Sequence, residues 1–275
     1  MSQLLIRTVK PRWGACRHVV AALGLVALTM AGLGLGLLAV SPVHADQRLT
    51  VVELYTSQGC PACPSADALL ADLADQPGIL ALSFHVDYWD YIGWTDPFAN
   101  EVYSQRQQRY LEQLKLPYVY TPQMVVDGQL HASGNRQPQV EANIERARDL
   151  KQGRVTVAVT RISDDQVRIQ IPGSDALYRG EADIMLVRFD EKHVTDVTRG
   201  ENKGKTLTNH NVVRLLRPVA DWNGEAVDMV MRLQDIGGAD PAYCAIFVQE
   251  RGQGRILGAS VVDMRSISTP IPPRG

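Results

Sequence analysis

The hydrophobic and polar positions between residues 46 and 152 alternate between strand-like and helix-like patterns. Residues 49–55 form an apolar run rich in β-branched side chains, and residues 79–86 form a second, so both are predicted to be buried strands. Between them, apolar residues recur at helical spacing until Pro77-Gly78 ends the pattern: Ala66, Leu69, Leu70 and Leu73. A strand, a helix and a strand of these lengths predict a βαβ unit with parallel strands.

The rest of this region predicts a helical insertion and a hairpin. An aromatic stretch follows the second strand, and Asp96 is expected to cap a polar helix that ends near Leu114, which makes residues 88–116 an insertion. Asp127-Gly128 is a strong hairpin signal after a strand that starts beyond Pro122. A last helix is predicted over about 138–151. The region is therefore expected to be an α/β domain.

The pattern changes to a period of two after Gly153. Apolar residues alternate with polar ones in short runs separated by Gly, Asp and Asn turns, beginning with Val155, Val157 and Val159. This pattern is typical of an antiparallel sandwich, so residues 153–267 are predicted to form an all-β domain. The Pro-rich residues 268–275 are predicted to be a disordered tail.

Residues 1–45 have the pattern of a secretory signal peptide. Four basic residues precede an apolar run over 19–40, and Val43-His44-Ala45 offers a cleavage site. The protein is therefore expected to be exported, to a periplasmic or extracellular location, with a membrane attachment only if this segment is retained. Removing the segment changes the formal net charge from −2 to about −6, which argues against a nucleic-acid partner.

Candidate chemistry is concentrated in Cys60-Pro61-Ala62-Cys63, between the first strand and the first helix. With Cys60 near the N-cap, unpaired N–H groups and the helix dipole favour a thiolate, so Cys60 is expected to attack and Cys63 to resolve a mixed disulfide. Two alternatives are a structural disulfide and a soft-metal site, for Cu(I), that uses the same thiolates and perhaps His85. No organic cofactor is expected, because no Gly-rich phosphate loop is present. Cys244 is expected to be a buried apolar residue.

Other residues are weaker candidates. Glu53 lies in an apolar strand and His85 ends the next one, so either is a possible proton-transfer group; the alternatives are a strand-end acid and a hydrogen-bonded core histidine. The aromatic residues at 88–94 either line a substrate groove or pack the insertion. The polar loop 199–205 is a solvated hairpin, a binding loop or a bridge back to the first domain.

The combination of Cys60-Pro61-Ala62-Cys63 with Thr121-Pro122 before a strand resembles the thioredoxin superfamily. Longer strings, such as those at 55–67, 85–90 and 200–205, resemble the secreted domain-of-unknown-function-1223 family over almost the whole exported chain. The resemblance implies a thioredoxin-like domain over 46–152 with a β-rich domain after it. It further implies a thiol–disulfide oxidoreductase, in which Thr121 and Pro122 hold protein thiol or disulfide clients or an electron-donor protein. Besides an oxidoreductase and a soft-metal binding module, a third possible function is that of a non-enzymatic interaction protein.

Cleavage of the signal segment can be tested directly. Mass spectrometry of the protein purified from the extracytoplasmic fraction is expected to find an N-terminus near Asp46. Recovery of peptides from residues 1–40 in that fraction would instead indicate a retained anchor.

Overall fold

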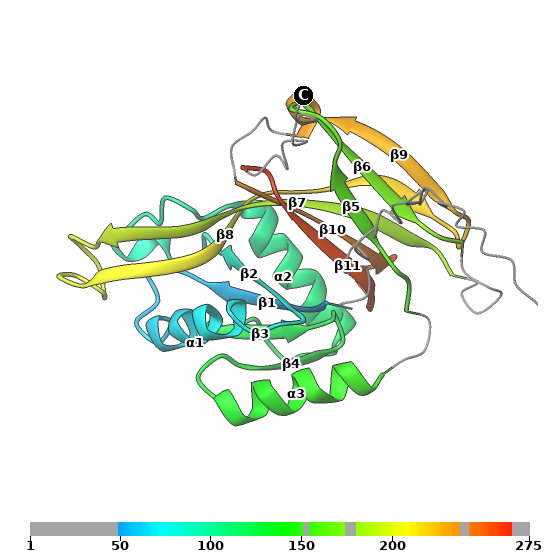
Figure 1. Cartoon of the computed structure of the whole chain (residues 1–275). Coiled ribbons are helices and arrows are strands. Elements are labelled where there is room, and N and C mark those ends of the chain that lie inside the picture. The colour runs from blue at the N-terminus through cyan, green and yellow to red at the C-terminus, as the bar shows by residue number, and fades with distance from the viewer. Residues whose placement is uncertain (1–48, 151–153, 174–179, 237–241, 266–275) are drawn as a thin grey trace, which may run out of the picture. The chain divides into compact units, whose positions relative to one another are not determined.

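The computed structural model describes residues 49–150, 154–173, 180–236 and 242–265 (Figure 1). The predicted signal segment 1–45, the boundary at 152/153 and the predicted tail 268–275 lie outside the described residues.

The described chain forms three α-helices and eleven strands. The helices are α1 (Pro64–Ala74), α2 (Glu101–Gln113) and α3 (Gln137–Asp149), with short 3-10 helices η1 (Asp90–Ile92) and η2 (Leu233–Ile236). The strands of the first half are β1 (Thr50–Thr56), β2 (Ile79–His85), β3 (Gln123–Val126) and β4 (Leu130–Ser133). Those of the second half are β5 (Ala158–Arg161), β6 (Gln166–Ile171), β7 (Ala182–Asp196), β8 (Thr206–Trp222), β9 (Val227–Arg232), β10 (Tyr243–Glu250) and β11 (Ile256–Asp263).

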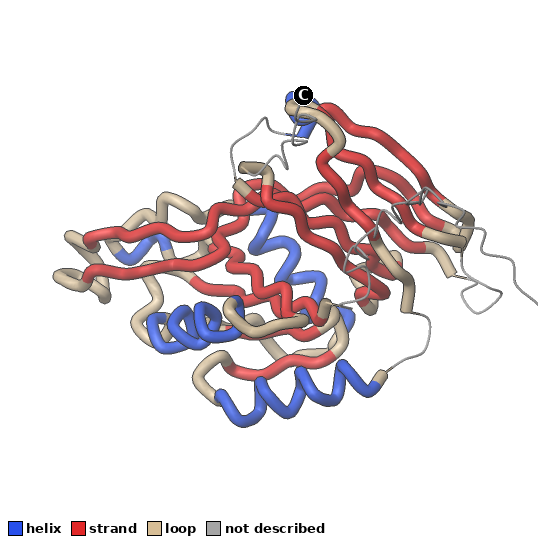
Figure 2. Tube along the Cα trace, viewed as in Figure 1, coloured by secondary structure: helices blue, strands red, loops and turns tan. Residues whose placement is uncertain are grey.

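Strands from both halves of the chain form one mixed, eight-stranded sheet in the order β11-β10-β7-β8-β2-β1-β3-β4 (Figures 1 and 2). β1 and β2 pair in parallel, and β8 adds to the free edge of β2, also in parallel, with Ser83 opposite Val212. The remaining strands, β5, β6 and β9, form a separate antiparallel sheet.

The predicted fold class, an α/β thioredoxin-like domain with a helical insertion followed by an all-β antiparallel domain, is therefore wrong. The long β7–β8 hairpin extends the sheet of the first half into the second half, and most of the second half's strands belong to that sheet. The physical reason is that β2 would otherwise be an edge strand with unpaired N–H and C=O groups, and β8 pairs with them. Periodicity detects strands but not the strand to which each pairs.

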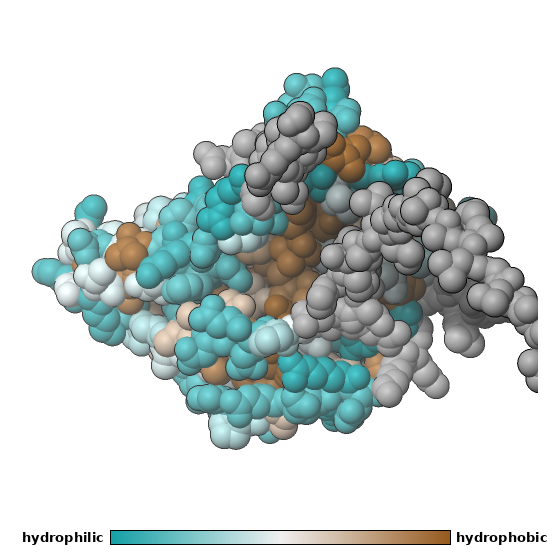
Figure 3. All heavy atoms as spheres, viewed as in Figure 1, coloured by the Kyte–Doolittle hydropathy of each residue, from teal (hydrophilic) through white to brown (hydrophobic). Residues whose placement is uncertain are grey.

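Three apolar clusters fill the two faces of the large sheet. Successive residues of β1 point to opposite faces: Val51 and Tyr55 join the cluster that contains α2, whereas Val52 and Leu54 pack with α1 and α3. Alternate residues of β10 likewise pack with the α2 cluster or against the three-stranded sheet. On the face drawn in Figure 3, mostly hydrophilic residues cover the region of α1 and α3, as expected for helices that bury one side.

Two local predictions shift in the structure. The polar helix begins at Glu101, and its N-cap is Asn100, whose side chain accepts from the N–H of Val102 at 2.9 Å, so Asp96 is not the cap. The helix after the cysteine pair begins at Pro64 with Cys63 as its N-cap, so Cys60 lies one turn before the helix. Both helices are where periodicity places them, but the capping residues differ.

A buried ion pair joins the first half of the chain to the second. Arg106 of α2 donates to both carboxylate oxygens of Glu53 in β1, at 2.7 and 3.0 Å, and to Gln249 of β10 at 2.9 Å. Tyr55 and Tyr110 donate to the same carboxylate at 2.9 and 2.6 Å. Although burial acts to lower the pKa of Arg106, the charge of Glu53 holds it well above its ordinary value. Both carboxylate oxygens of Glu53 therefore accept hydrogen bonds, although the group is fully buried.

Replacing Arg106 by Ala is expected to lower the free energy of unfolding by about 3–5 kcal/mol, because it leaves the Glu53 carboxylate buried without its cation. Urea unfolding at pH 7 measures the loss. Arg148→Ala, which removes the solvent-exposed pair of Arg148 with Glu145, is the matched control and is expected to cost less than about 1 kcal/mol. Equal costs for the two variants would contradict the role of the buried pair.

Candidate functional site

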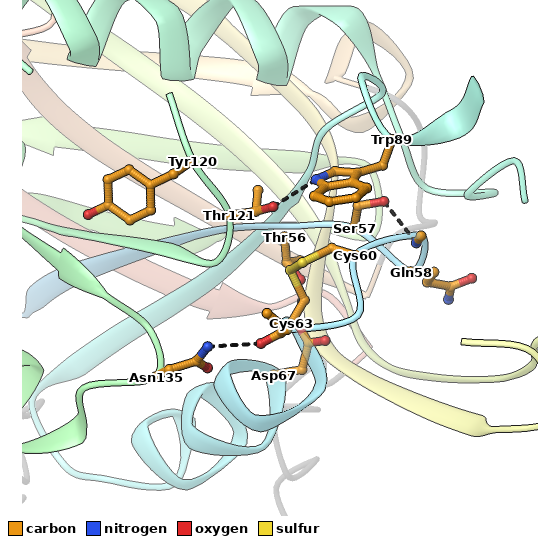
Figure 4. Close-up of a disulfide and its surroundings, with 12 residues drawn as sticks. Thr56, Ser57, Gln58, Cys60, Cys63, Asp67, Trp89, Tyr120, Thr121 and Asn135 are labelled. Carbon is orange, nitrogen blue, oxygen red and sulfur yellow. Dashed lines mark hydrogen bonds between the residues drawn. A yellow bond between two sulfur atoms is a disulfide. The ribbon is translucent and has the colours of Figure 1, made fainter. Parts of the chain in front are cut away.

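The structure joins Cys60 and Cys63 in a disulfide at the start of α1 (Figure 4), with their Cα atoms 5.4 Å apart. Two tight turns bring them together. The N–H of Cys60 donates to the carbonyl of Ser57 at 3.1 Å, and the N–H of Cys63 donates to the carbonyl of Cys60 at 3.3 Å. Cys63 then caps α1 with its main chain, since its carbonyl accepts from Ala66 and Asp67 at 2.9 and 3.0 Å. The disulfide therefore lies at the positive end of the helix dipole.

Both sulfur-bearing side chains are fully buried, whereas Pro61 and Ala62 between them are exposed. Trp89 packs on the residue before Cys60: a Cβ atom added to Gly59 would lie 3.1 Å from the Cβ of Trp89. The indole N–H of Trp89 donates to the Thr121 hydroxyl at 2.7 Å. The disulfide thus lies just beneath the surface, and a side chain at position 59 would require Trp89 to move by a few tenths of an ångström.

Gln58 is a fully buried hub beside the disulfide. Its side-chain amide donates to Thr195 and Asn209 of the β7–β8 hairpin, each at 3.0 Å, and its side-chain oxygen accepts from the Trp94 indole at 3.2 Å. Its main-chain N–H donates to Asp96 at 2.7 Å. All of the hydrogen-bonding groups of this side chain are used, which fixes the turn that leads into Cys60.

The loop between β7 and β8 also holds the cysteine turn. Asn202 is fully buried, and its amide donates to the carbonyls of Gln58 and Cys60, both at 2.9 Å. The oxygen of Asn202 accepts from Lys205 at 2.9 Å. Of the three readings of loop 199–205, the structure therefore matches the bridge back to the first half of the chain.

A buried carboxyl group lies one helical turn beyond Cys63. Asp67 accepts from the Thr56 hydroxyl at 2.9 Å, and burial raises its pKa from 3.8 to about 7, although the neighbouring His85 and the Thr56 hydrogen bond act to lower it. Asp67 is not among the site residues that the sequence predicts. The available signal was its spacing, because residues four apart lie on the same side of a helix.

His85 and Asp96 form a buried pair near Asp67. The two groups are 2.7 Å apart through Nδ1 of His85, and Nε2 of His85 is buried without a hydrogen-bond partner in the described part of the chain. Burial acts to raise the pKa of Asp96, but the charge and hydrogen bond of His85 and the N–H groups of Gln58 and Phe98 lower it overall. The structure thus brings His85 next to the site, as a hydrogen-bonded core histidine.

The other predicted site residues lie in different surroundings. Glu53 accepts hydrogen bonds from Arg106, Tyr55 and Tyr110, so it belongs to the buried ion-pair cluster of α2 and β1. Thr121 and Pro122 are linked by a cis peptide bond, and Gly134 lies between Pro122 and Ala66 of α1: an added Cβ would be 3.3 Å from the former and 2.5 Å from the latter. Thr121 and Pro122 are therefore brought beside the start of α1. Cys244 is buried in β10, where burial raises its pKa to about 11.

No group of three or more His, Cys, Asp or Glu side chains among the described residues could hold a metal ion. Within the part of the chain that the structure describes, no helix is both long enough and apolar enough to cross a membrane.

A family model described as "Protein of unknown function (DUF1223)" matches residues 51–249. The chain belongs to this family. The match includes the cysteine pair, Asp67 and the β7–β8 hairpin. No curated protein sequence matches the chain.

The chain is similar to a crystal structure of protein AGR_C_4864 from Agrobacterium tumefaciens, with 28% identity and a TM-score of 0.71 over 82% of this chain and 99% of that chain. β-Glucosidases from Kluyveromyces marxianus and Thermotoga neapolitana match with TM-scores of only 0.21 and 0.20, at 9% and 11% identity, and cover 40% and 39% of this chain and 14% and 15% of theirs. These two matches carry no argument about fold or function.

Asp67 makes stability depend on pH. The folded protein keeps the Asp67 proton up to about pH 7, whereas the unfolded chain releases it near 3.8, so the folded state binds more protons between these values. The free energy of unfolding is therefore highest near pH 4 as far as Asp67 is concerned. It falls as the pH rises towards 7, by up to roughly 1.4 kcal/mol per pH unit.

Urea unfolding of the oxidised protein between pH 4 and 7 tests this. Asp67→Asn, which cannot titrate, is expected to remove the downward trend in stability, while Asp72→Asn on the exposed side of the same helix is expected to keep it. An unchanged trend in the Asp67 variant would assign it to other groups.

Proposed function

We propose that this protein is an exported thiol–disulfide oxidoreductase whose redox centre is the Cys60–Cys63 pair. The observation that carries the proposal is the disulfide at the N-terminus of α1. Export follows from the signal pattern of residues 1–45 and would take the protein to a compartment where disulfides persist.

A redox role explains this disulfide better than a structural role. Disulfides stabilise a fold mainly by removing conformational entropy from the unfolded chain, and a loop of two intervening residues has little to remove. The helix N-terminus, in contrast, stabilises a negative charge, so reduction of this disulfide to a thiolate is favoured at this position. The pair is therefore placed where thiol–disulfide exchange is easiest.

The exchange proceeds in two steps that conserve electrons. The Cys60 thiolate attacks one sulfur of a client disulfide, forms a mixed disulfide and releases the other client sulfur as a thiolate. Cys63 then loses its proton and attacks the Cys60 sulfur, which re-forms the Cys60–Cys63 disulfide and releases the second client thiolate. The client gains two electrons and the protein loses two; the reverse sequence oxidises a client dithiol.

Asp67 is the proposed proton acceptor for Cys63. It lies on the same side of α1, one turn beyond Cys63, and its raised pKa of about 7 suits proton exchange near neutral pH. This role replaces the one considered for Glu53, whose carboxylate is neutralised by Arg106. Thr121 and Pro122, beside the start of α1, are proposed to contact the client chain.

Access to the sulfur atoms is part of the mechanism. Both cysteines are fully buried in the oxidised protein, so a client or reductant must displace the covering atoms before it reaches Cys60. Pro61 and Ala62, between the cysteines, are exposed and Trp89 is half-buried, so a local movement of these residues is the proposed route to Cys60.

Trapping of mixed disulfides tests the proposal. Cys63→Ala removes the resolving thiol, so this variant is expected to accumulate covalent complexes with disulfide-bonded clients that dithiothreitol releases. Cys60→Ala is expected to form few such complexes, and Cys244→Ser, which alters a buried thiol outside the pair, is the matched control and is expected to behave as the wild-type protein does.

The reduced wild-type protein is expected to reduce insulin disulfides, because the N-terminus of α1 stabilises a thiolate in the cysteine pair. The absence of both trapped complexes and insulin reduction would refute the proposed function. Copper bound by the anaerobically purified protein would then favour the soft-metal alternative.

A further inference from the structure

A pocket of about 540 Å³ opens between the segment after α2 and the start of α3, close to the cysteine turn. None of its lining residues belongs to the cysteine pair or its hydrogen-bond network. The residues that matter for its chemistry are Leu116, Pro117, Tyr118, Tyr120, His131 and Arg136.

The pocket carries one positive charge and no negative one. No Asp or Glu lines it, and the exposed Arg136 guanidinium makes no hydrogen bond or ion pair with any residue that the structure describes. Burial lowers the pKa of His131, so this ring is neutral near pH 7. An unpaired guanidinium at the edge of a pocket without acids favours a carboxylate, which it can bind through two parallel hydrogen bonds.

Aromatic rings form the apolar part of the wall. The rings of Tyr118 and Tyr120 meet edge to face with centroids 6.3 Å apart, and Tyr118 is 65% exposed. The Tyr120 hydroxyl is 2.9 Å from Nδ1 of His131, which fixes both rings. Rings that are fixed in place and open to solvent offer a surface on which an apolar or aromatic side chain can pack at little entropic cost.

Two chain segments connect the pocket to the redox centre. Asn135 donates to the carbonyl of Ala62 at 3.1 Å and accepts from Ser65 at 2.7 Å, and the following residue is Arg136. Tyr120 precedes Thr121, and Figure 4 shows Tyr120 and Asn135 on the same side of the disulfide. A client chain bound at the cysteine turn can therefore extend to the pocket.

We propose that this pocket selects clients by binding a carboxylate side chain together with an adjacent apolar or aromatic side chain. The identity of the bound chain as a disulfide client rests on the proposed function, whereas the preference for an acidic, aromatic segment rests on the pocket alone. Arg136 binds the carboxylate, and Tyr118 and Tyr120 contact the neighbouring side chain.

The pocket can be tested without any redox step by titrating the oxidised protein with two tetrapeptides, blocked at both ends, and monitoring binding by NMR. The sequences are Ser-Glu-Phe-Ser and Ser-Lys-Phe-Ser, which differ at one position, where an ammonium group replaces the carboxylate. The glutamate peptide is expected to bind about tenfold more tightly, because a charged hydrogen bond to Arg136 is formed. Arg136→Gln is expected to abolish this preference, whereas Arg146→Gln, which removes an exposed charge farther along α3, is expected to retain it.

Equal affinity for the two peptides, or a preference that survives Arg136→Gln, would overturn the pocket assignment. Either result leaves insulin reduction and mixed-disulfide trapping unaffected, so it would not count against the redox centre. Conversely, a protein that binds the glutamate peptide through Arg136 but exchanges no disulfides would keep the pocket and lose the proposed function.

Discussion

A carboxylate in the middle of a sheet is tolerated only if its charge is compensated, and the Glu53–Arg106 pair meets this requirement by joining distant parts of the chain. Arg106 reaches from α2 to β1 and, through Gln249, to β10. Its main-chain carbonyl accepts from Gln253 in the turn after β10. The pair therefore fixes α2 on a sheet that both halves of the sequence build, and it makes the two halves depend on each other for satisfied polar groups.

The cysteine turn, like the ion pair, lies where the two halves of the chain meet. The cysteines come from the β1–α1 connection, but the amide that holds the Cys60 carbonyl comes from the β7–β8 loop. Gln58 connects the turn to the same hairpin and, through Asp96, to His85. A network of this kind fixes one geometry of the turn, because a shift of any member leaves a buried group without its partner.

The sequence predicts the elements of this protein better than their arrangement. Hydrophobic spacing places α1 and β1 well, and Cys60 and Cys63 stand out because reactive cysteines at a strand–helix junction are chemically distinctive. The pairing of β2 with β8 has no local signal, since it joins residues more than a hundred positions apart, and so the predicted fold class was wrong. The sequence offers loop 199–205 as a possible bridge to the first half of the chain, but it does not predict which residue makes the contact, because Asn202 is an ordinary polar loop residue until the fold buries it.

Gly59 shows how little of this site tolerates change. Its backbone is in contact with Trp89, and Trp89 is hydrogen-bonded to Thr121, so one missing side chain lets two separate loops meet over the cysteine turn. Even an alanine at this position would place its Cβ 3.1 Å from the Cβ of Trp89, so Trp89 would have to shift by a few tenths of an ångström. A larger residue at position 59 would therefore disturb the contact between Trp89 and Thr121 that lies beside the cysteine turn.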